Sequence, residues 1–181
     1  MGLIVTLITL LAWLIGFAFI LRAWFYATRI PPFNPFSQTI YRVTDWAALP
    51  LQQLIKPHGK FDIPSLIVVW LCGFAYLFAT FQFQLFNPLG MVIVGALTGL
   101  KWWLSILFWG LIIQAILSWV NPAAPIAPLL QALTAPLLNP IRNLLPNTGA
   151  IDFSPLVLII ATQVISVLVQ TLSRNILFAQ L

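Results

Sequence analysis

The sequence has very few charged residues and few side chains that do chemistry. Only 6% of its 181 residues are charged, with three acids in all, and it holds one cysteine and one histidine. A soluble domain carries about 25% charged residues, so this composition excludes a soluble enzyme. It equally excludes a disordered chain, and the single cysteine excludes a disulfide framework.

Apolar residues are abundant instead, at 61% of the chain, and the prolines mark where helices are interrupted. Because proline breaks a helix interior, its absence predicts uninterrupted helices. The proline-free segments are 3–27, 65–83, 91–119 and 156–178. A membrane-crossing helix needs about 20 mainly apolar residues. The sequence therefore predicts an all-α integral membrane protein with four transmembrane helices, Leu3–Ala27, Pro64–Phe83, one ending at Val120, and Pro155–Ser173.

The start of the third span is ambiguous from sequence. Lys101 is followed by Trp102 and Trp103, a pattern typical of a helix end at the membrane interface. It predicts a third span from Lys101 and a separate short interfacial helix over 89–100, where Gly95 and Gly99 have the spacing of a helix-contact motif. The alternative is one long tilted helix from Gly90 to Val120.

The two halves of the chain resemble each other. At an offset of 90 residues, turn, cap and core positions recur without a gap: Thr44 and Thr134, Pro50 and Pro140, Leu54 and Leu144, Gly59 and Gly149, Asp62 and Asp152, and Leu66 and Leu156. With a shifted register, Asn34-Pro35 matches Asn121-Pro122 and Arg22-Ala23 matches Gln114-Ala115. We predict repeats at 1–84 and 101–181, joined by a linker at 85–100. Two spans per repeat make them parallel, each a helix, an amphipathic loop and a helix.

Each repeat loop has the polar periodicity of an amphipathic helix lying in the membrane interface. Prolines predict a kink at Pro50 in the first loop and at Pro136 and Pro140 in the second. In the first loop, Arg42 and Asp45 are spaced three apart and can pair. One interpretation is a docking surface for a partner or lipid, and the other is a helix that packs back on its own bundle.

The second and fourth spans both begin with an acid followed by proline. The sequences are Asp62-Ile63-Pro64 and Asp152-Phe153-Ser154-Pro155. Asp and Ser cap free amides in a first helical turn, and proline is tolerated there, so we expect these acids to cap helices. The alternative is a role as an ion or proton site within the membrane.

These residues resemble the YggT family of bacterial inner-membrane proteins, which is related to the YlmG proteins of plastids. The second repeat carries Ser118-Trp119-Val120-Asn121-Pro122, Thr134-Ala135-Pro136, Pro140-Ile141-Arg142, Pro146 and Asp152-Phe153-Ser154-Pro155. The first repeat departs from that pattern at Trp46, Gln52 and Pro64-Ser65. The resemblance implies no established catalytic activity and loose links to osmotic or potassium tolerance, to cytochrome assembly in plastids, and to envelope organisation.

The motif residues are the candidate interaction residues. They are Asn34, Pro35, Thr44, Asp62, Asn121, Pro122, Thr134, Pro136, Arg142, Pro146, Asp152, Ser154 and Pro155. We expect a scaffold or assembly factor that presents its loops to lipid, to a membrane-protein partner or to a second copy. The alternative is a channel or ion-homeostasis protein lined by Asn121, Asn139, Asn143, Asp62 and Asp152.

Catalysis is not expected, because we find no catalytic, cofactor or metal motif. His58 lies in a Pro57-His58-Gly59 turn, and no second histidine exists to share a metal ion with it. No basic run or aromatic-interleaved patch predicts nucleic-acid binding.

Membrane topology follows from the placement of the basic residues. Arg29, Arg42, Lys56, Lys60 and Arg142 lie in the two repeat loops, which the positive-inside rule places in the cytoplasm. The resemblance implies an inner-membrane location, and both termini are then expected outside. We predict that alkaline phosphatase fused after Leu181 is active. A reporter that fluoresces only in the cytoplasm should not fluoresce when it is fused at the same position. The reverse pattern would overturn this topology.

Overall fold

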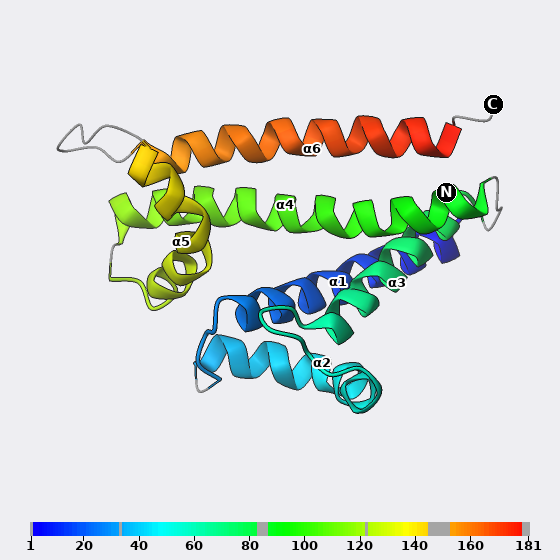
Figure 1. Cartoon of the computed structure of the whole chain (residues 1–181), viewed down its shortest axis with the longest axis horizontal. Coiled ribbons are helices and arrows are strands. Elements are labelled where there is room, and N and C mark those ends of the chain that lie inside the picture. Colours follow the sequence, from blue (N-terminus) through cyan, green and yellow to red (C-terminus); the bar gives the residue numbers. More distant parts are fainter. Residues whose placement is uncertain (1, 33, 83–86, 122, 145–152, 179–181) are drawn as a thin grey trace. The chain divides into compact units, whose positions relative to one another are not determined.

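A computed structural model describes residues 2–32, 34–82, 87–121, 123–144 and 153–178. Within these ranges the chain is all-helical, as the composition predicts. The helices are α1 (Leu3–Ala27), α2 (Pro35–Leu54), α3 (Ile63–Thr80), α4 (Pro88–Val120), α5 (Ala127–Leu144) and α6 (Ser154–Phe178) (Figure 1).

Four of the helices are long and apolar enough to cross a membrane. They are α1, α3, α4 over Pro88–Ser118, and α6. The predicted number of spans is therefore confirmed. The two repeat loops contain α2 and α5, which are not among the candidate spans.

The separate interfacial helix predicted for residues 89–100 is wrong. Helix α4 runs from Pro88 through Lys101 to Val120 without a break, in agreement with the long-helix alternative. Nothing after Pro88 removes a backbone donor, since the next proline in the sequence is Pro122. Trp102, which suggested a helix end, is buried and packs edge-on against Tyr76 of α3 with ring centroids 5.6 Å apart.

The chain divides into two compact units. Unit 1 comprises residues 1–103 and 169–181, and unit 2 comprises residues 104–168. In unit 1, α1 packs along α3 (Figure 1). Buried side chains such as Phe19, Phe25 and Val69 fill the space among its helices. In unit 2, α4 and α5 bury leucines, among them Leu107, Leu111 and Leu138.

Glycines allow α3 and α4 to approach closely within unit 1. A Cβ built on Gly73 would collide with the carbonyl oxygen of Gly95, and one built on Gly95 would lie 3.1 Å from the Phe74 nitrogen. Trp70 adds a hydrogen bond by donating from Nε1 to the Val92 carbonyl at 2.9 Å. The predicted role of Gly95 and Gly99 in helix contact is thus confirmed, and their partner is α3.

Prolines lie inside both non-spanning helices. Pro50 is within α2, and Pro136 and Pro140 are within α5. Figure 1 shows that both helices change direction along their length, as an internal proline leads one to expect.

We predict that Gly73→Ala destabilises the protein by about 1–3 kcal/mol, because the added methyl group forces α3 away from α4. Gly110→Ala is the matched control. A Cβ at Gly110 would meet only Leu130, at 4.0 Å, so this change should be neutral or slightly stabilising. Denaturant titrations in detergent measure both, and equal effects of the two substitutions would contradict the close contact.

Candidate functional site

A buried guanidinium connects the first three helices. Arg22 lies in the apolar helix α1 and is only 4% exposed. Its Nη1 donates to Asp45 Oδ1 of α2 at 2.6 Å, and its Nε donates to Asp62 Oδ2 at 3.3 Å. A buried charge is costly unless it is paired, so these contacts hold α2 and the start of α3 against α1.

The hydroxyl of Thr44 completes this cluster on α2. It accepts from Arg22 Nη1 at 2.8 Å and donates to the Ile40 carbonyl at 2.7 Å. The guanidinium also lies over the Tyr41 ring, 4.8 Å from its centroid. Burial raises the pKa of the Tyr41 phenol above its usual range, while the nearby Arg22 charge acts to lower it. A neutral phenol is therefore favoured beside the two carboxylates.

Asp62 is part of this ion pair and does not cap α3 with its side chain. It occupies the N-cap position, but its carboxylate makes no capping hydrogen bond. Oδ2 instead accepts from Arg22 and from the Ser65 hydroxyl at 2.5 Å. The predicted capping role is therefore wrong, because the nearby guanidinium is a stronger partner than the helix amides. The Asp62 side chain is 1% exposed, and its Oδ1 atom has no hydrogen-bond partner among the described residues.

The pairing predicted between Arg42 and Asp45 is also wrong. Asp45 bonds to Arg22, and no ion pair joins it to Arg42 in the part of the chain that the structure describes. The side chain of Arg42 is exposed on the outer side of α2. Asp45 remains 40% exposed, so its charge stays partly solvated while that of Asp62 does not.

Asn34 and Pro35 have a local structural role. Asn34 Oδ1 accepts from the Phe36 amide at 3.0 Å and so caps α2, which begins at Pro35. The buried Ser37 hydroxyl donates to the Pro31 carbonyl at 2.8 Å. This turn fixes where α2 leaves the end of α1.

Unit 2 contains a neutral counterpart of the Arg22 contact. The Thr134 hydroxyl of α5 donates to Gln114 Oε1 of α4 at 2.8 Å and is 1% exposed. Gln114 and Thr134 match Arg22 and Thr44 in the sequence repeat. Each unit therefore joins a long apolar helix to a non-spanning helix through corresponding residues.

The other described candidates of the second repeat lie at different places on α5 and α6 and on the segment after α4. Ser154 is buried at the start of α6, where Pro155 lies in the first turn. Arg142 donates to Asn139 Oδ1 at 3.4 Å on the exposed side of α5. Asn121 and Pro136 are exposed. Pro122, Pro146 and Asp152 lie outside the described residues.

Five residues of the contacts around Arg22 and Thr134 were not among the sequence candidates. They are Arg22, Tyr41, Asp45, Ser65 and Gln114. Two sequence signals point to Arg22 and Gln114. Arg22 ends an otherwise uncharged apolar run, and it matches Gln114 in the repeat. Among the described residues, no group of three or more His, Cys, Asp or Glu side chains could hold a metal ion.

The helices and these contacts define a class of protein, a multi-pass α-helical membrane protein that carries a non-spanning helix in each half. The CCB3/YggT family model matches residues 1–83 and 93–173, so the chain belongs to the CCB3/YggT family.

Relatives match over most of their length. The uncharacterized protein YggT of Escherichia coli K12 is 38% identical over 148 residues, which cover 81% of this chain and 78% of the relative. An uncharacterized protein of Vibrio alginolyticus encoded in the proC 3' region is 34% identical over 155 residues, 80% of each chain. An uncharacterized protein of Haemophilus influenzae is 36% identical over 139 residues, 76% of this chain and 75% of the relative. No solved structure matches the chain.

We predict that Arg22→Met destabilises the protein by about 3–5 kcal/mol, because it leaves Asp62 charged and buried without its partner. Asp62→Asn in the same chain should recover part of this loss. Arg42→Met, at an exposed position, should change the unfolding free energy by only about 0.5 kcal/mol. Unfolding in detergent followed by circular dichroism measures all three variants. A double variant no more stable than Arg22→Met would contradict the pairing.

Proposed function

We propose that the protein is a non-enzymatic scaffold or assembly factor of the bacterial inner membrane. In this role each repeat presents its non-spanning helix, α2 or α5, to a membrane-protein partner or to lipid. The repeat loops are then cytoplasmic and both termini lie outside. The sequence and the described contacts support a role in binding, with no step of covalent chemistry.

The observation that carries this proposal is the paired attachment of α2 and α5. Arg22 bonds to Thr44 on α2, and Gln114 bonds to Thr134 on α5. Arg22, Thr44 and Thr134 are buried, and Gln114 is partly buried. A buried polar contact has specific geometry and is costly to break, so it fixes the direction of each helix. The side chains on the outer side of each helix are thereby preorganised. Preorganisation reduces the conformational entropy that is lost when a partner binds.

Helix α5 is the better candidate for contact with a protein partner. Its exposed side chains include Gln131, Asn139 and Asn143, and Leu144 is exposed at its end. Amides both donate and accept, so they form directional hydrogen bonds with another helix, also in a membrane. The second repeat is also the one that carries the fuller set of family motifs.

The ion-conducting alternative is less well supported. A conduction path needs dipoles or charges that line it and remain available to the ion. Asp62, one of its candidate lining carboxylates, is 1% exposed and paired with Arg22. Asn121, Asn139 and Asn143 are exposed, but an exposed amide serves an interaction surface equally well.

Site-specific photo-crosslinking in cells tests the scaffold. A photoreactive residue at Gln131 or at Asn143 should capture the same membrane protein, because both positions are exposed on α5. The same residue at Val164, an exposed apolar position of α6, is the control and should give lipid adducts only. The scaffold would be wrong if the two α5 positions captured no common protein, or the same set as Val164.

A further inference from the structure

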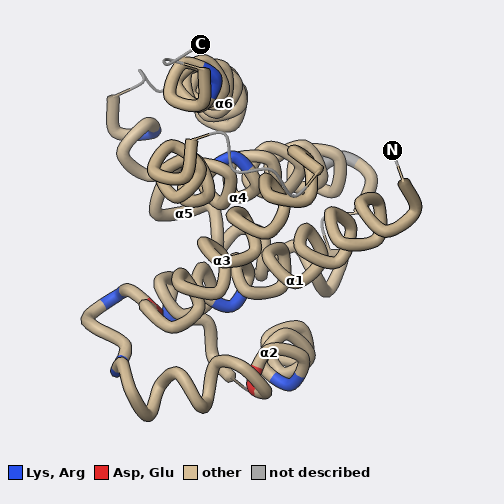
Figure 2. Tube along the Cα trace, turned by 90° about the vertical axis from the view of Figure 1, so that its right-hand side faces the viewer, with Lys and Arg blue, Asp and Glu red and all other residues tan. Residues whose placement is uncertain are grey.

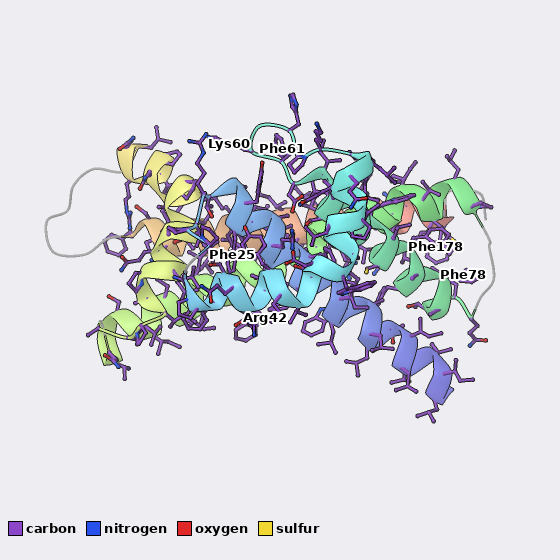
Figure 3. The ribbon with its side chains drawn as sticks, turned by 90° about the horizontal axis from the view of Figure 1, so that it is seen from below. Phe25, Arg42, Lys60, Phe61, Phe78 and Phe178 are labelled. Carbon is purple, nitrogen blue, oxygen red and sulfur yellow. The ribbon has the colours of Figure 1, made fainter. Side chains whose placement is uncertain are left out.

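We propose that anionic phospholipid headgroups bind unit 1 at a basic surface formed by Arg29, Arg42, Lys56 and Lys60. We call these four residues the α2 basic surface. This inference rests on the proposed function, because it takes α2 as a helix that the protein presents to a ligand. It adds to the proposed function the chemical class of that ligand. Figure 3 shows unit 1 from the α2 side, with Arg42 on the helix and Lys60 and Phe61 on the loop that follows.

The four cations have no carboxylate partner in the described structure. All four side chains are exposed, and no ion pair involves any of them. The two acids of this region, Asp45 and Asp62, are both committed to Arg22. Figure 2 shows basic positions on α2 and on the adjoining loops, with few acidic ones to balance them. The surface therefore presents net positive charge to whatever covers it.

The same region exposes large apolar side chains. Trp46 of α2 is 67% exposed, Leu54 at its end is 83% exposed, and Phe61 is 64% exposed. Aromatic residues beside Lys and Arg anchor proteins at the boundary between lipid tails and headgroups. An acidic soluble partner would satisfy the cations but would not account for these apolar neighbours.

The position of the surface along the chain also favours lipid. It lies on the segment between Ala27, where the candidate span α1 ends, and Ile63, where the candidate span α3 begins. A segment that connects two spans on one side of the membrane starts and ends at the headgroup layer. Headgroup phosphates are therefore present there at high local concentration.

The loops hold two of these cations in defined places. Arg29 has φ 55°, a left-handed backbone that glycine adopts more readily, and its amide donates to the Tyr26 carbonyl at 3.1 Å. His58 and Phe61 exchange two backbone hydrogen bonds of 3.0 and 2.9 Å, which places Gly59 and Lys60 at the tip of a tight turn.

The second repeat provides an internal contrast. At the offset of 90, Arg42, Lys56 and Lys60 correspond to Ala132, Pro146 and Ala150. The three cations are thus absent from the corresponding positions of a repeat whose turn and cap residues otherwise match. The lipid preference is accordingly assigned to the first repeat.

Native mass spectrometry of the full chain in mild detergent tests the proposal. Phosphatidylglycerol and phosphatidylcholine with identical acyl chains are added in equal amounts, and the lipid retained by the protein is counted. We expect phosphatidylglycerol to be retained preferentially. Lys56→Gln with Lys60→Gln should lower that preference at least about fivefold, since one cation near the surface contributes about a fivefold effect.

The matched control is Lys101→Gln with Arg174→Gln, which removes the same amount of charge elsewhere in unit 1 and should preserve the preference. Thermal unfolding of both double variants verifies that they are folded.

Equal retention of the two lipids by the wild type would overturn the proposal. An equal loss of the phosphatidylglycerol preference in both double variants would also overturn it. Displacement of phosphatidylglycerol by soluble glycerol phosphate would also overturn it, by indicating a phosphate site rather than a lipid site. Equal retention of the two lipids by the wild type, together with intact crosslinking from Gln131 and Asn143, would reject this inference and leave the scaffold standing.

Discussion

The ion pairs of Arg22 are the constraint on which the rest of unit 1 depends. A guanidinium inside an apolar helix must find acceptors, because burying it unpaired would cost several kcal/mol. The acceptors come from two other elements, Asp45 and Thr44 on α2 and Asp62 at the start of α3. One side chain thereby ties both α2 and the start of α3 to α1. The Asn34 cap of α2, the proline in the first turn of α3 and apolar packing act alongside it.

The two repeats solve the same attachment problem with different chemistry. Gln114 and Thr134 form a neutral hydrogen bond, whose net contribution is about 1 kcal/mol and which leaves no net charge to be balanced. Arg22 needs two carboxylates near it, and both acids of the first repeat are used in this way. The remaining basic residues of that repeat therefore stay uncompensated. The four cations of the α2 basic surface are in this sense left over once both acids pair with the buried arginine.

The spans were predictable because proline and charge act locally. Proline removes a backbone donor wherever it occurs, so gaps between prolines locate α1, α3 and α6 without tertiary information. Asp62 was misjudged because capping and ion pairing use the same carboxylate, and the choice depends on a residue 40 positions away. Lys101 and Trp102 were misjudged for a similar reason, since burial against Tyr76 and exposure at an interface look alike in sequence. The buried cluster was only partly predictable: Thr44 and Asp62 were found through the repeat, whereas Arg22 was noted as a repeat match and not as a candidate residue.

Duplication followed by divergence explains why the two non-spanning helices need not share one ligand. A surface helix that must remain attached is constrained mainly on its buried side, at Thr44 or Thr134. Its outer side is free to change without cost to the fold, since exposed substitutions alter stability by only about 0.5 kcal/mol. The first repeat loop carries Arg29, Arg42, Lys56 and Lys60, whereas the second carries Arg142 alone, a difference expected of two outer surfaces selected separately. A protein that binds lipid through one repeat can hold a partner through the other, because neither contact disturbs the buried pair beneath it.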